Sequence, residues 1–451
     1  MATMDGSILA IAAPSLRSSL NASGAQLQMI VAAYTLSFAV LVVTSARLGD
    51  ILGRRRAFMQ GLAAFTLASL AAGLAPTPGA LIVARALQGG TSALMTAQVL
   101  SIIQTHFSGE ERARAIGAYS MILAVGVAAG QVVGGLLLSV DYAFASWRAA
   151  LLLNVPVGVV VLVCARAALP EMAAGEERRL DLGGVGLLAA ALLALLVPLS
   201  FGREYGWPVW VWPCLAVWLL ASWGFVSFER HLESRKRAPL FDLGLLGLPR
   251  VASGVLAVLL GMGCYAGFLL SLTLYLQNDL QYSPLHAGAV FAIYASGFAV
   301  ASLTWTRVSV AIRTQLPMLG PLVMGAAILA VGLIASNGTW PLAVVGPLLF
   351  AGGVGHACGF SPLANRLTTL VKPAQASSLS GLILTADFIG MAFGVAAFVG
   401  VYLSAAPQGP GPALALTSGM ISAALVVTAG CPTCPRTSDR SAGWSPPPIQ
   451  P

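Results

Sequence analysis

Long apolar runs alternate with short clusters of charged residues along this chain. Runs such as Ser18–Ala46, Ala57–Ala84 and Val251–Asn278 contain no charged side chain. Each exceeds the roughly 20 residues that an α-helix needs to cross a hydrocarbon core of about 30 Å. A membrane β-barrel would instead show segments of about 10 residues with alternating hydrophobicity. The pattern therefore predicts membrane-spanning helices.

Proline and glycine breaks divide the runs into fourteen predicted helices. Their bounds are 1–16, 28–48, 57–74, 79–107, 114–138, 147–169, 182–201, 208–228, 251–277, 284–306, 316–336, 341–361, 374–403 and 412–430. The least marked break is Ser336-Asn337-Gly338-Thr339, which lies inside an uncharged stretch. A turn there separates the eleventh and twelfth helices.

Composition supports lipid as the main solvent of this chain. Hydrophobic residues make up 57% of it, charged residues only 9%, and the mean hydropathy is +0.85. Soluble domains are about one quarter charged. The net charge of +8 could suggest a nucleic-acid partner. Basic residues in short loops orient membrane proteins, however, so we expect a lipid bilayer and no nucleic acid.

The basic residues also predict an orientation. When the loop with Arg54, Arg55 and Arg56 is assigned to the cytoplasm, twenty of the twenty-four lysines and arginines face inward, as does the C-terminus. Helices 7 and 8 then separate two blocks of six. This organisation predicts a first bundle over 1–169, an insertion over 170–250, a second bundle over 251–430 and a disordered tail over 431–451.

The loop after the second helix combines glycines, an aspartate and arginines. Gly49 and Gly53 permit a tight turn and close helix approach. Asp50 can accept hydrogen bonds from a helix N-terminus or an arginine, while Arg54 and Arg55 can bind anionic lipid. The alternative is a loop that only sets topology, with an incidental aspartate.

This loop resembles a signature of the major facilitator superfamily, G-x-L-[AG]-D-x-x-G-R-[RK], with Ala46 at the first glycine. The resemblance extends over about residues 4–430, and its first-helix motif is similar to that of the fourteen-helix drug:proton antiporters. The matching segments are Met4–Leu9 with Ala13–Leu16, Arg85–Gly90, Gly126–Gly135, Trp147-Arg148, Asn154–Gly158, Tyr275–Gln277 and Ser283–Gly288. It implies an all-α major facilitator fold of two six-helix bundles plus two inserted central helices.

A glycine motif in the fifth helix predicts close helix packing. Gly126, Gly130 and Gly134 are four residues apart and share a face, with Gly135 beside them. The motif usually holds Gly-Pro where this chain has Gly130-Gln131, so a proline kink is not predicted.

Three charges inside the membrane are candidates for proton coupling: Asp5, Arg85 and Asp387. A charge at mid-membrane costs about 2.5–3.5 kcal/mol on insertion scales, which suggests function. In the family the arginine at Arg85 is tied to proton transfer; alternatively it only forms structural hydrogen bonds. Asp387 could take up a proton or pair with a cationic substrate, or it could be a carboxyl held neutral by desolvation.

The first predicted helix is short. Sixteen residues span about 24 Å, less than the hydrocarbon core. Either the true start lies upstream, or the helix is short and its neighbours fill the gap. On this reasoning Asp5 lies near the cytoplasmic surface.

Several other polar and aromatic residues could line a substrate cavity. They are Tyr34, Gln88, Tyr119, Tyr265 and Gln277, together with Phe38. His356 could titrate near neutral pH, but a buried histidine with a hydrogen-bond partner is the better interpretation. Cys431 and Cys434 lack the further ligands that a structural zinc site needs, so no metal is expected.

The resemblance implies a proton-coupled exporter of small, largely hydrophobic compounds such as antibiotics. The alternatives are uptake of a nutrient, export of an endogenous metabolite, or a membrane enzyme or sensor. Against an enzyme, no catalytic carboxylate pair, nucleophile–histidine pair or phosphate loop is evident. We expect a monomer in a bacterial inner membrane that uses a proton gradient and no cofactor.

Overall fold

The computed structural model describes residues 1, 4–5, 8–9, 12, 15–16, 19–138, 146–169, 182–202, 206–235, 244–372 and 375–430. Its regular elements in this part are helices. The described residues between Met4 and Leu20 are helical. Next come α2 (Gly24–Leu52), α3 (Arg54–Gly73), α4 (Pro78–His106), α5 (Gly109–Leu138), α6 (Ser146–Leu152), α7 (Asn154–Ala168), α8 (Leu182–Phe201), α9 (Val211–Ser234) and α10 (Gly244–Gly247). They are followed by α11 (Pro249–Leu274), η1 (Tyr275–Asp279), α12 (Pro284–Thr304), η2 (Trp305–Arg307), α13 (Val310–Arg313), α14 (Leu316–Ser336), α15 (Leu342–Thr369), α16 (Ala376–Gly394), η4 (Val395–Val399), α17 (Gly400–Ala405), η5 (Ala406–Gln408) and α18 (Pro410–Ala429).

The helix bounds agree with the apolar pattern where turn residues are strong. The break between α14 and α15 is confirmed, and Gly338 adopts φ +68° there. The apolar pattern did not predict the full length of helices that continue into polar sequence: α15 extends to Thr369, and α5 begins at Gly109. The first helix also continues to Leu20, beyond the predicted end at Leu16.

Three predicted helices are interrupted. The sixth is divided into α6 and α7 around Leu153. Pro156 explains this break, because it has no N–H to donate to the carbonyl of Leu152. In the second half, α11 ends in the π-helical η1, and α16 continues through the π-helical η4 into α17. Such π segments often occur at functional sites.

Local sequence signals fix several helix starts. At α2, Ser23 Oγ accepts from the Gln26 amide at 3.2 Å, and the Gln26 side chain accepts from the Ser23 amide at 3.0 Å. Thr77 caps α4, with Pro78 in the first turn. Ser283 and Pro284 do the same for α12. These caps satisfy amides that a helix start leaves without partners.

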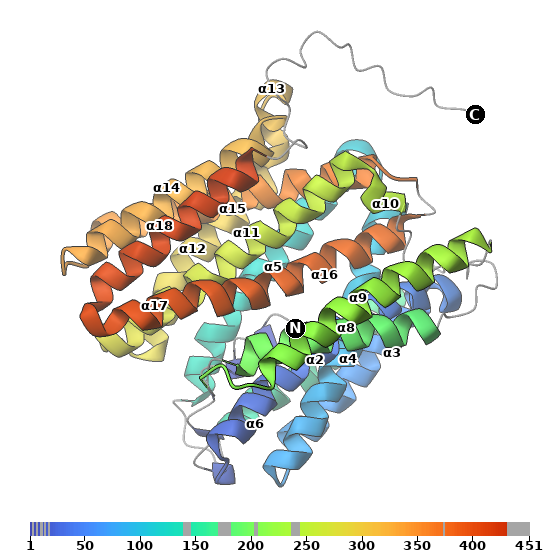
Figure 1. Ribbon diagram of the computed structural model, residues 1–451, viewed down its shortest axis with the longest axis horizontal. Helices are drawn as coiled ribbons and strands as arrows, with labels where there is room; N and C mark the ends of the chain where they lie inside the picture. Colours follow the sequence, from blue (N-terminus) through green and yellow to red (C-terminus); the bar gives the residue numbers. More distant parts are fainter. Residues whose placement is uncertain are drawn as a thin grey trace.

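The helices form two groups (Figure 1). One contains α2–α7, with α5 in contact with α4 and α6; the other contains α11, α12 and α14–α18. They meet where α2 packs on α16 and where α5 packs on α12. The pair α8 and α9 lies beside this junction, with α8 against α2 and α16.

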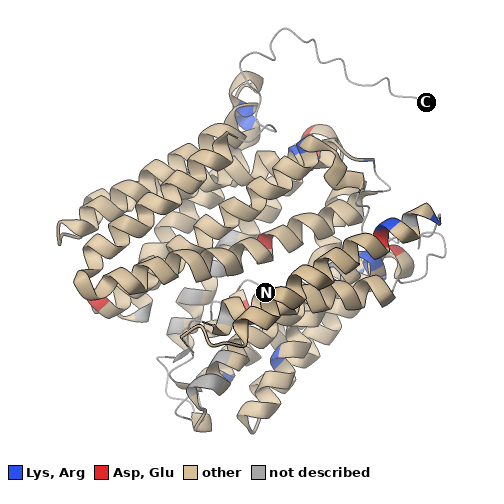
Figure 2. Ribbon diagram, in the orientation of Figure 1, with Lys and Arg blue, Asp and Glu red and all other residues tan. Residues whose placement is uncertain are grey.

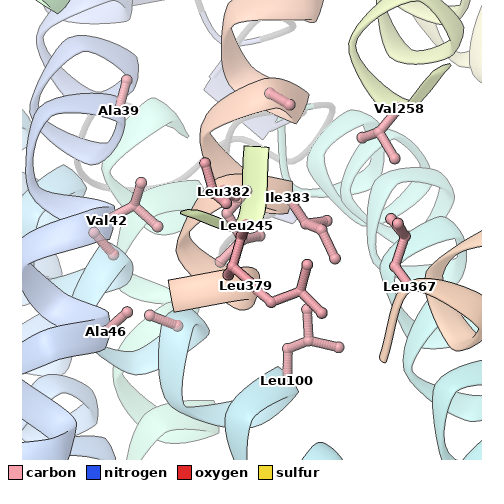
Figure 3. Packing of buried hydrophobic residues seen from close by; sticks show 14 of the residues in the cluster. Ala39, Val42, Ala46, Leu100, Leu245, Val258, Leu367, Leu379, Leu382 and Ile383 are labelled. Carbon is pink, nitrogen blue, oxygen red and sulfur yellow. The ribbon is translucent and has the colours of Figure 1, made fainter. Parts of the chain in front are cut away.

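A hydrophobic cluster fills the junction between α2 and α16. Figure 3 shows Leu379, Leu382 and Ile383 of α16 opposite Ala39 and Val42 of α2. Leu188, Leu192 and Leu196 of α8 belong to the same cluster. The inserted pair therefore contributes to the core between the two groups.

Outer surfaces are apolar and charges gather near helix ends (Figure 2). On α9, Trp212 and Trp223 are 68% and 73% exposed, which suits lipid contact. Within the described residues, eight helices are long and apolar enough to cross a membrane, or nine if the bent parts of α2 count as one span. The molecule is thus an all-helical, multi-pass membrane protein.

Candidate functional site

Asp5 lies in a buried polar network between the first helix, α4 and α7. Arg85 Nη1 donates to Asp5 Oδ2, and neither side chain is more than 1% exposed. Asn154 Nδ2 donates to Asp5 Oδ1 at 2.6 Å, and Gln88 Nε2 lies 3.5 Å from the same oxygen. A position near the cytoplasmic surface was expected to leave the Asp5 carboxylate in contact with water, and that contact is absent, since its side chain is fully buried. Protein donors, not water, surround its carboxylate.

Arg85 has further partners around its guanidinium group. Its Nη1 donates to Gln88 Oε1 at 3.0 Å, and its Nε donates to the Ile30 carbonyl at 3.4 Å. The guanidinium carbon lies 4.5 Å from the centre of the Tyr34 ring, a cation–π arrangement. Tyr34 and Gln88, predicted to line a cavity, thus contact Arg85.

A second layer of contacts orients these partners. Tyr34 Oη donates to Ser92 Oγ at 2.9 Å, and Gln88 Nε2 donates to Ser69 Oγ at 2.9 Å. A Cβ added at Gly89 would lie 2.2 Å from the Tyr34 carbonyl oxygen. Gly89 therefore lets α4 approach α2 closely enough to place Arg85 beside Tyr34.

Asn154 is a member of this network that the sequence reasoning missed. It was noted as part of a motif but not as a site residue. The available signal was an amide inside an otherwise apolar span, next to Pro156. Its side chain is fully buried, which requires a polar partner. Asp5 is that partner.

The charges of Asp5 and Arg85 depend on each other. Breaking a buried ion pair by removing one partner costs about 3–5 kcal/mol, because the remaining charge is uncompensated. A proton on Asp5 would remove its negative charge in the same way. Arg85 would then keep Gln88, Tyr34 and the Ile30 carbonyl as partners.

Asp387 has a different environment in the middle of α16. It lies eleven residues from Ala376, or about 16 Å along the helix. Its Oδ1 is sealed from solvent and has no hydrogen-bond donor among the described residues. The residue as a whole is only half-buried, so some of its surface stays accessible deep in the protein.

Two predicted cavity tyrosines lie near Asp387. Its charge acts on the hydroxyl groups of Tyr119 in α5 and Tyr265 in α11. Asp387 of α16 is therefore within electrostatic reach of both tyrosines. Gln277 is not part of this group, since it lies in η1, about 18 Å along the helix from Tyr265.

A row of aromatic rings connects the surroundings of Arg85 and Asp387. Tyr34 and Phe38 lie one turn apart on α2, with ring centres 6.4 Å apart. Phe38 stacks on Phe388 of α16 at 4.1 Å. Phe388 directly follows Asp387 in the chain. The row thus extends from the ring beside Arg85 to the residue that follows Asp387.

The predicted loop after the second helix is reduced to Gly53, between α2 and α3, and the residues on either side of it are held by its arginines. Asp50 Oδ1 accepts from Arg54 Nη2 at 3.3 Å, which confirms the predicted arginine partner. Arg54 Nη1 also donates to the Ser101 carbonyl at 3.1 Å, near the end of α4. Arg55 Nη2 donates to the Arg166 carbonyl at 2.9 Å. The arginines therefore tie the loop to the ends of neighbouring helices.

Backbone conformation and close packing explain why glycine occurs at positions 53 and 49. Gly53 adopts φ +87°, a left-handed conformation that other residues rarely adopt. A Cβ added at Gly49 would lie 1.8 Å from Gln98 Oε1. A larger residue there would displace the Gln98 side chain, whose Nε2 donates to the Ser45 carbonyl at 2.7 Å.

The glycine motif of α5 is partly accounted for. A Cβ at Gly134 would lie 3.2 Å from Ile8 Cγ1, so this face packs on the first helix. Gly130 is buried and Gly126 is half-buried. Gly135 lies within α5, but its surroundings are outside the described residues. Helix α5 continues as one element through the position where the motif usually has proline.

Contacts between the two groups of helices occur at the end that carries the Arg54 loop. Ser101 of α4 lies 3.3 Å from Ser380 of α16, Oγ to Oγ. Arg313 of α13 donates to Glu110 of α5 at 2.5 Å. A Cβ at Gly117 would lie 2.1 Å from the Ser302 carbonyl oxygen. The two groups are thus closed on each other at this end.

His356 of α15 is buried among aromatic rings. Its Nδ1 lies 3.0 Å from Tyr294 Oη, which confirms the interpretation of a buried, hydrogen-bonded histidine. Its ring centre lies 4.8 Å from that of Tyr265. Within the part of the chain that the structure describes, no three His, Cys, Asp or Glu side chains gather to hold a metal ion. Cys431 and Cys434 lie outside the described residues.

Comparison with known proteins assigns the fold and motifs to a family. Residues 1–395 match the family model described as Major Facilitator Superfamily. The chain belongs to this superfamily.

Three relatives within the Major Facilitator Superfamily cover most of the chain. A probable actinorhodin transporter of Streptomyces coelicolor is 35% identical, over 88% of this chain and 69% of its own. The cephamycin export protein CmcT of Amycolatopsis lactamdurans is 36% identical, over 89% and 82%. The puromycin resistance protein pur8 of Streptomyces alboniger is 34% identical, over 88% and 78%.

Solved structures confirm the major facilitator fold. The human organic anion transporter MFSD10 aligns with a TM-score of 0.63 and 14% identity, over 95% of this chain and 97% of its own. The proton:xylose symporter XylE gives 0.65 and 13%, over 95% and 93%. At such low identity these matches support the fold alone. Together with the apolar helices and the bacterial relatives, they identify a multi-pass protein of the bacterial cell membrane.

Proposed function

We propose that this protein exports small, largely hydrophobic compounds such as antibiotics from the bacterial cell, in exchange for protons. Its relatives include an export protein for cephamycin and a puromycin resistance protein, each matched over more than three quarters of its own length. The proposal extends their export activity to this chain. No cofactor is needed, since the proton gradient supplies the energy.

The buried Asp5–Arg85 pair is the observation that supports proton coupling. Its carboxylate is fully buried, and a proton there changes the balance of charge around Arg85. Asp387 is the second candidate, on the opposite side of the junction. We propose that Asp5, Arg85 and Asp387 together couple proton entry to substrate exit.

The proposed architecture has fourteen membrane-spanning helices. Six lie in residues 1–169 and six in 251–430, with α8 and α9 inserted between them. The C-terminus and the Arg54 loop face the cytoplasm, and the protein acts as a monomer. On this orientation, the Ser101–Ser380 and Glu110–Arg313 contacts close the cytoplasmic end. Substrate then binds between the two groups of helices, and rocking of the groups alternates access.

Drug accumulation with and without a protonophore tests the function. Cells that express the protein should accumulate less of a panel of antibiotics than cells with an empty vector, and a protonophore should abolish the difference. Membrane vesicles should show the same export when a pH gradient is imposed. Concentrative uptake of a compound, or export that ignores the gradient, would contradict the proposal.

A further inference from the structure

A cavity lies inside the second group of helices. Its walls come from α11, α14, α15 and α18, and it holds about 480 Å³ of empty space, including its open side. Every described residue that lines it belongs to this group. The cavity is therefore a different place from the Asp5–Arg85 pair, which lies in the first group, and from Asp387, which lies on α16.

The walls of this cavity are almost entirely apolar. Val258 of α11 and Leu425 of α18 are examples of the buried side chains that line it. Two polar side chains are among the described lining residues, His356 and Thr428. The Thr428 hydroxyl donates to the Ala424 carbonyl at 3.0 Å. Such a lining suits an uncharged, apolar ligand, whose orientation a single polar group can fix.

His356 supplies that polar group. Its side chain is 8% exposed, and its Nδ1 lies 3.0 Å from Tyr294 Oη. The Tyr294 hydroxyl has no other partner among the described residues, so its proton would lack an acceptor if Nδ1 were protonated. The hydroxyl therefore donates to Nδ1, and the ring proton is on Nε2.

The Nε2–H group is a donor without an acceptor. Among the described residues His356 has one hydrogen-bond partner, and that partner occupies Nδ1. The rings of Tyr265 and Phe298 hold the imidazole in place, each with its centre 4.8 Å from the His356 ring centre. A buried N–H that lacks an acceptor is costly, so a ligand that brings an oxygen to this fixed donor gains affinity.

The open side of the cavity is next to the junction between the two groups of helices. Of the described lining residues, Gly261, Met262 and Phe360 are half-buried, and the others are buried. These three therefore mark the open side. Val258 and Leu363 of the walls belong to the hydrophobic cluster at the junction of α2 and α16. The cavity thus adjoins the region in which we placed the substrate.

We propose that this cavity binds uncharged, apolar compounds that carry a hydrogen-bond acceptor such as a ketone oxygen, which accepts from His356 Nε2. A charged group is disfavoured there, because the described lining residues include no Asp, Glu, Lys or Arg to compensate it. Naming these compounds as cargo rests on the proposed export function, whereas their binding does not.

Photolabelling of the purified full-length protein in lipid nanodiscs tests the proposal. The probe is benzophenone, an uncharged ketone that attaches to nearby C–H bonds under ultraviolet light. Met324 of α14 lines the cavity and is 1% exposed, so a label on it, located by mass spectrometry, reports entry into the cavity. This label should saturate as the benzophenone concentration rises. Diphenylmethane, which has CH₂ in place of the carbonyl, should compete at least tenfold more weakly than benzophenone itself binds.

Two glycine variants form a matched pair. A Cβ added at Gly261 of α11 or at Gly419 of α18 would have no heavy atom within 4 Å, but only Gly261 is among the residues that line the cavity. Gly261→Leu should lower saturable labelling of Met324 at least tenfold, because the leucine side chain enters the cavity. Gly419→Leu should change it less than twofold.

A third variant tests the donor separately from the space. His356→Phe removes the N–H group and keeps an aromatic ring. In this variant benzophenone and diphenylmethane should bind with affinities within twofold of each other. Continued tenfold preference for the ketone would show that another group recognises the oxygen, and would overturn the assignment of His356.

Three results would overturn the cavity as a binding site. They are labelling of Met324 that does not saturate, equal losses in the two glycine variants, and equal competition by diphenylmethane in the unmodified protein. Gradient-driven export by a protein without saturable labelling would sustain the proposed function and reject this site. Saturable labelling without any gradient-driven export would sustain the site and reject the function.

Discussion

Replacement of Asp5 by asparagine should destabilise the protein strongly. The substitution leaves Arg85 buried, 1% exposed, without its anionic partner. Removing one member of a buried ion pair costs about 3–5 kcal/mol. Because each 1.4 kcal/mol is a factor of ten, the folded-to-unfolded ratio should fall by about a hundredfold or more. Asparagine can still accept a hydrogen bond, so the lower part of this range is expected.

A second substitution distinguishes the charge from the shape of the site. Asp5→Asn combined with Arg85→Gln removes both charges, and uncharged partners are tolerated better in the interior than one uncompensated charge. The double variant should regain at least half of the lost free energy of unfolding. Neither variant should support proton-coupled export.

Equilibrium unfolding in mixed detergent, followed by tryptophan fluorescence, provides the measurement. Asp387→Asn is the control, since it removes a carboxylate whose Oδ1 has no described hydrogen-bond donor. Its free energy of unfolding should stay within about 1 kcal/mol of the unmodified protein. The reasoning is refuted if Asp5→Asn lowers the free energy of unfolding by less than about 1 kcal/mol. It is also refuted if the double variant loses the sum of the free energies that Asp5→Asn and Arg85→Gln each lose alone.

Three further predictions concern transport. Asp387→Asn should insert and fold normally yet abolish proton-coupled export in vesicles; full activity in a well-expressed variant would make Asp387 structural. Asp50→Ala should slow export at least severalfold and leave the affinity for the cation tetraphenylphosphonium unchanged, because Asp50 pairs with Arg54 between α2 and α3 and not in the interior. Undiminished export would show that this segment has only a topological role. Glu110→Arg should lower the export rate by repelling Arg313 across the junction, and the added change Arg313→Glu should restore it; a swap that restores nothing would show that the ion pair does not contribute.

The fold could be predicted from the sequence because lipid imposes a simple rule. Every apolar run long enough to span must satisfy its own backbone hydrogen bonds, so each becomes a helix. That rule does not predict where helices break for other reasons. The interruption at Leu153 depends on a single proline, and the apolar pattern does not distinguish the π segments at Tyr275–Asp279 and Val395–Val399 from α-helix.

The candidate site was predictable only in part. Charges within apolar runs drew attention to Asp5, Arg85 and Asp387. Their partners were not evident, because Asn154 and Gln88 reach Asp5 only through tertiary packing. The misplacement of Asp5 had the same origin. Its distance from the chain start suggested a surface position, whereas Arg85 determines where the carboxylate lies.

The row of aromatic rings links the free energy of proton binding at Asp5 to the packing of the helices beside Asp387. Phe38 shares α2 with Tyr34, which faces Arg85, and it stacks on Phe388 of the opposite group of helices. A rocking motion that separates Phe38 from Phe388 also disturbs the neighbour of Arg85. Linkage is reciprocal. If the open and closed junctions differ in affinity for the Asp5 proton, binding of that proton shifts the equilibrium between the open and closed states by the same free energy. A double-mutant cycle on Phe38 and Asp5 measures this shared free energy.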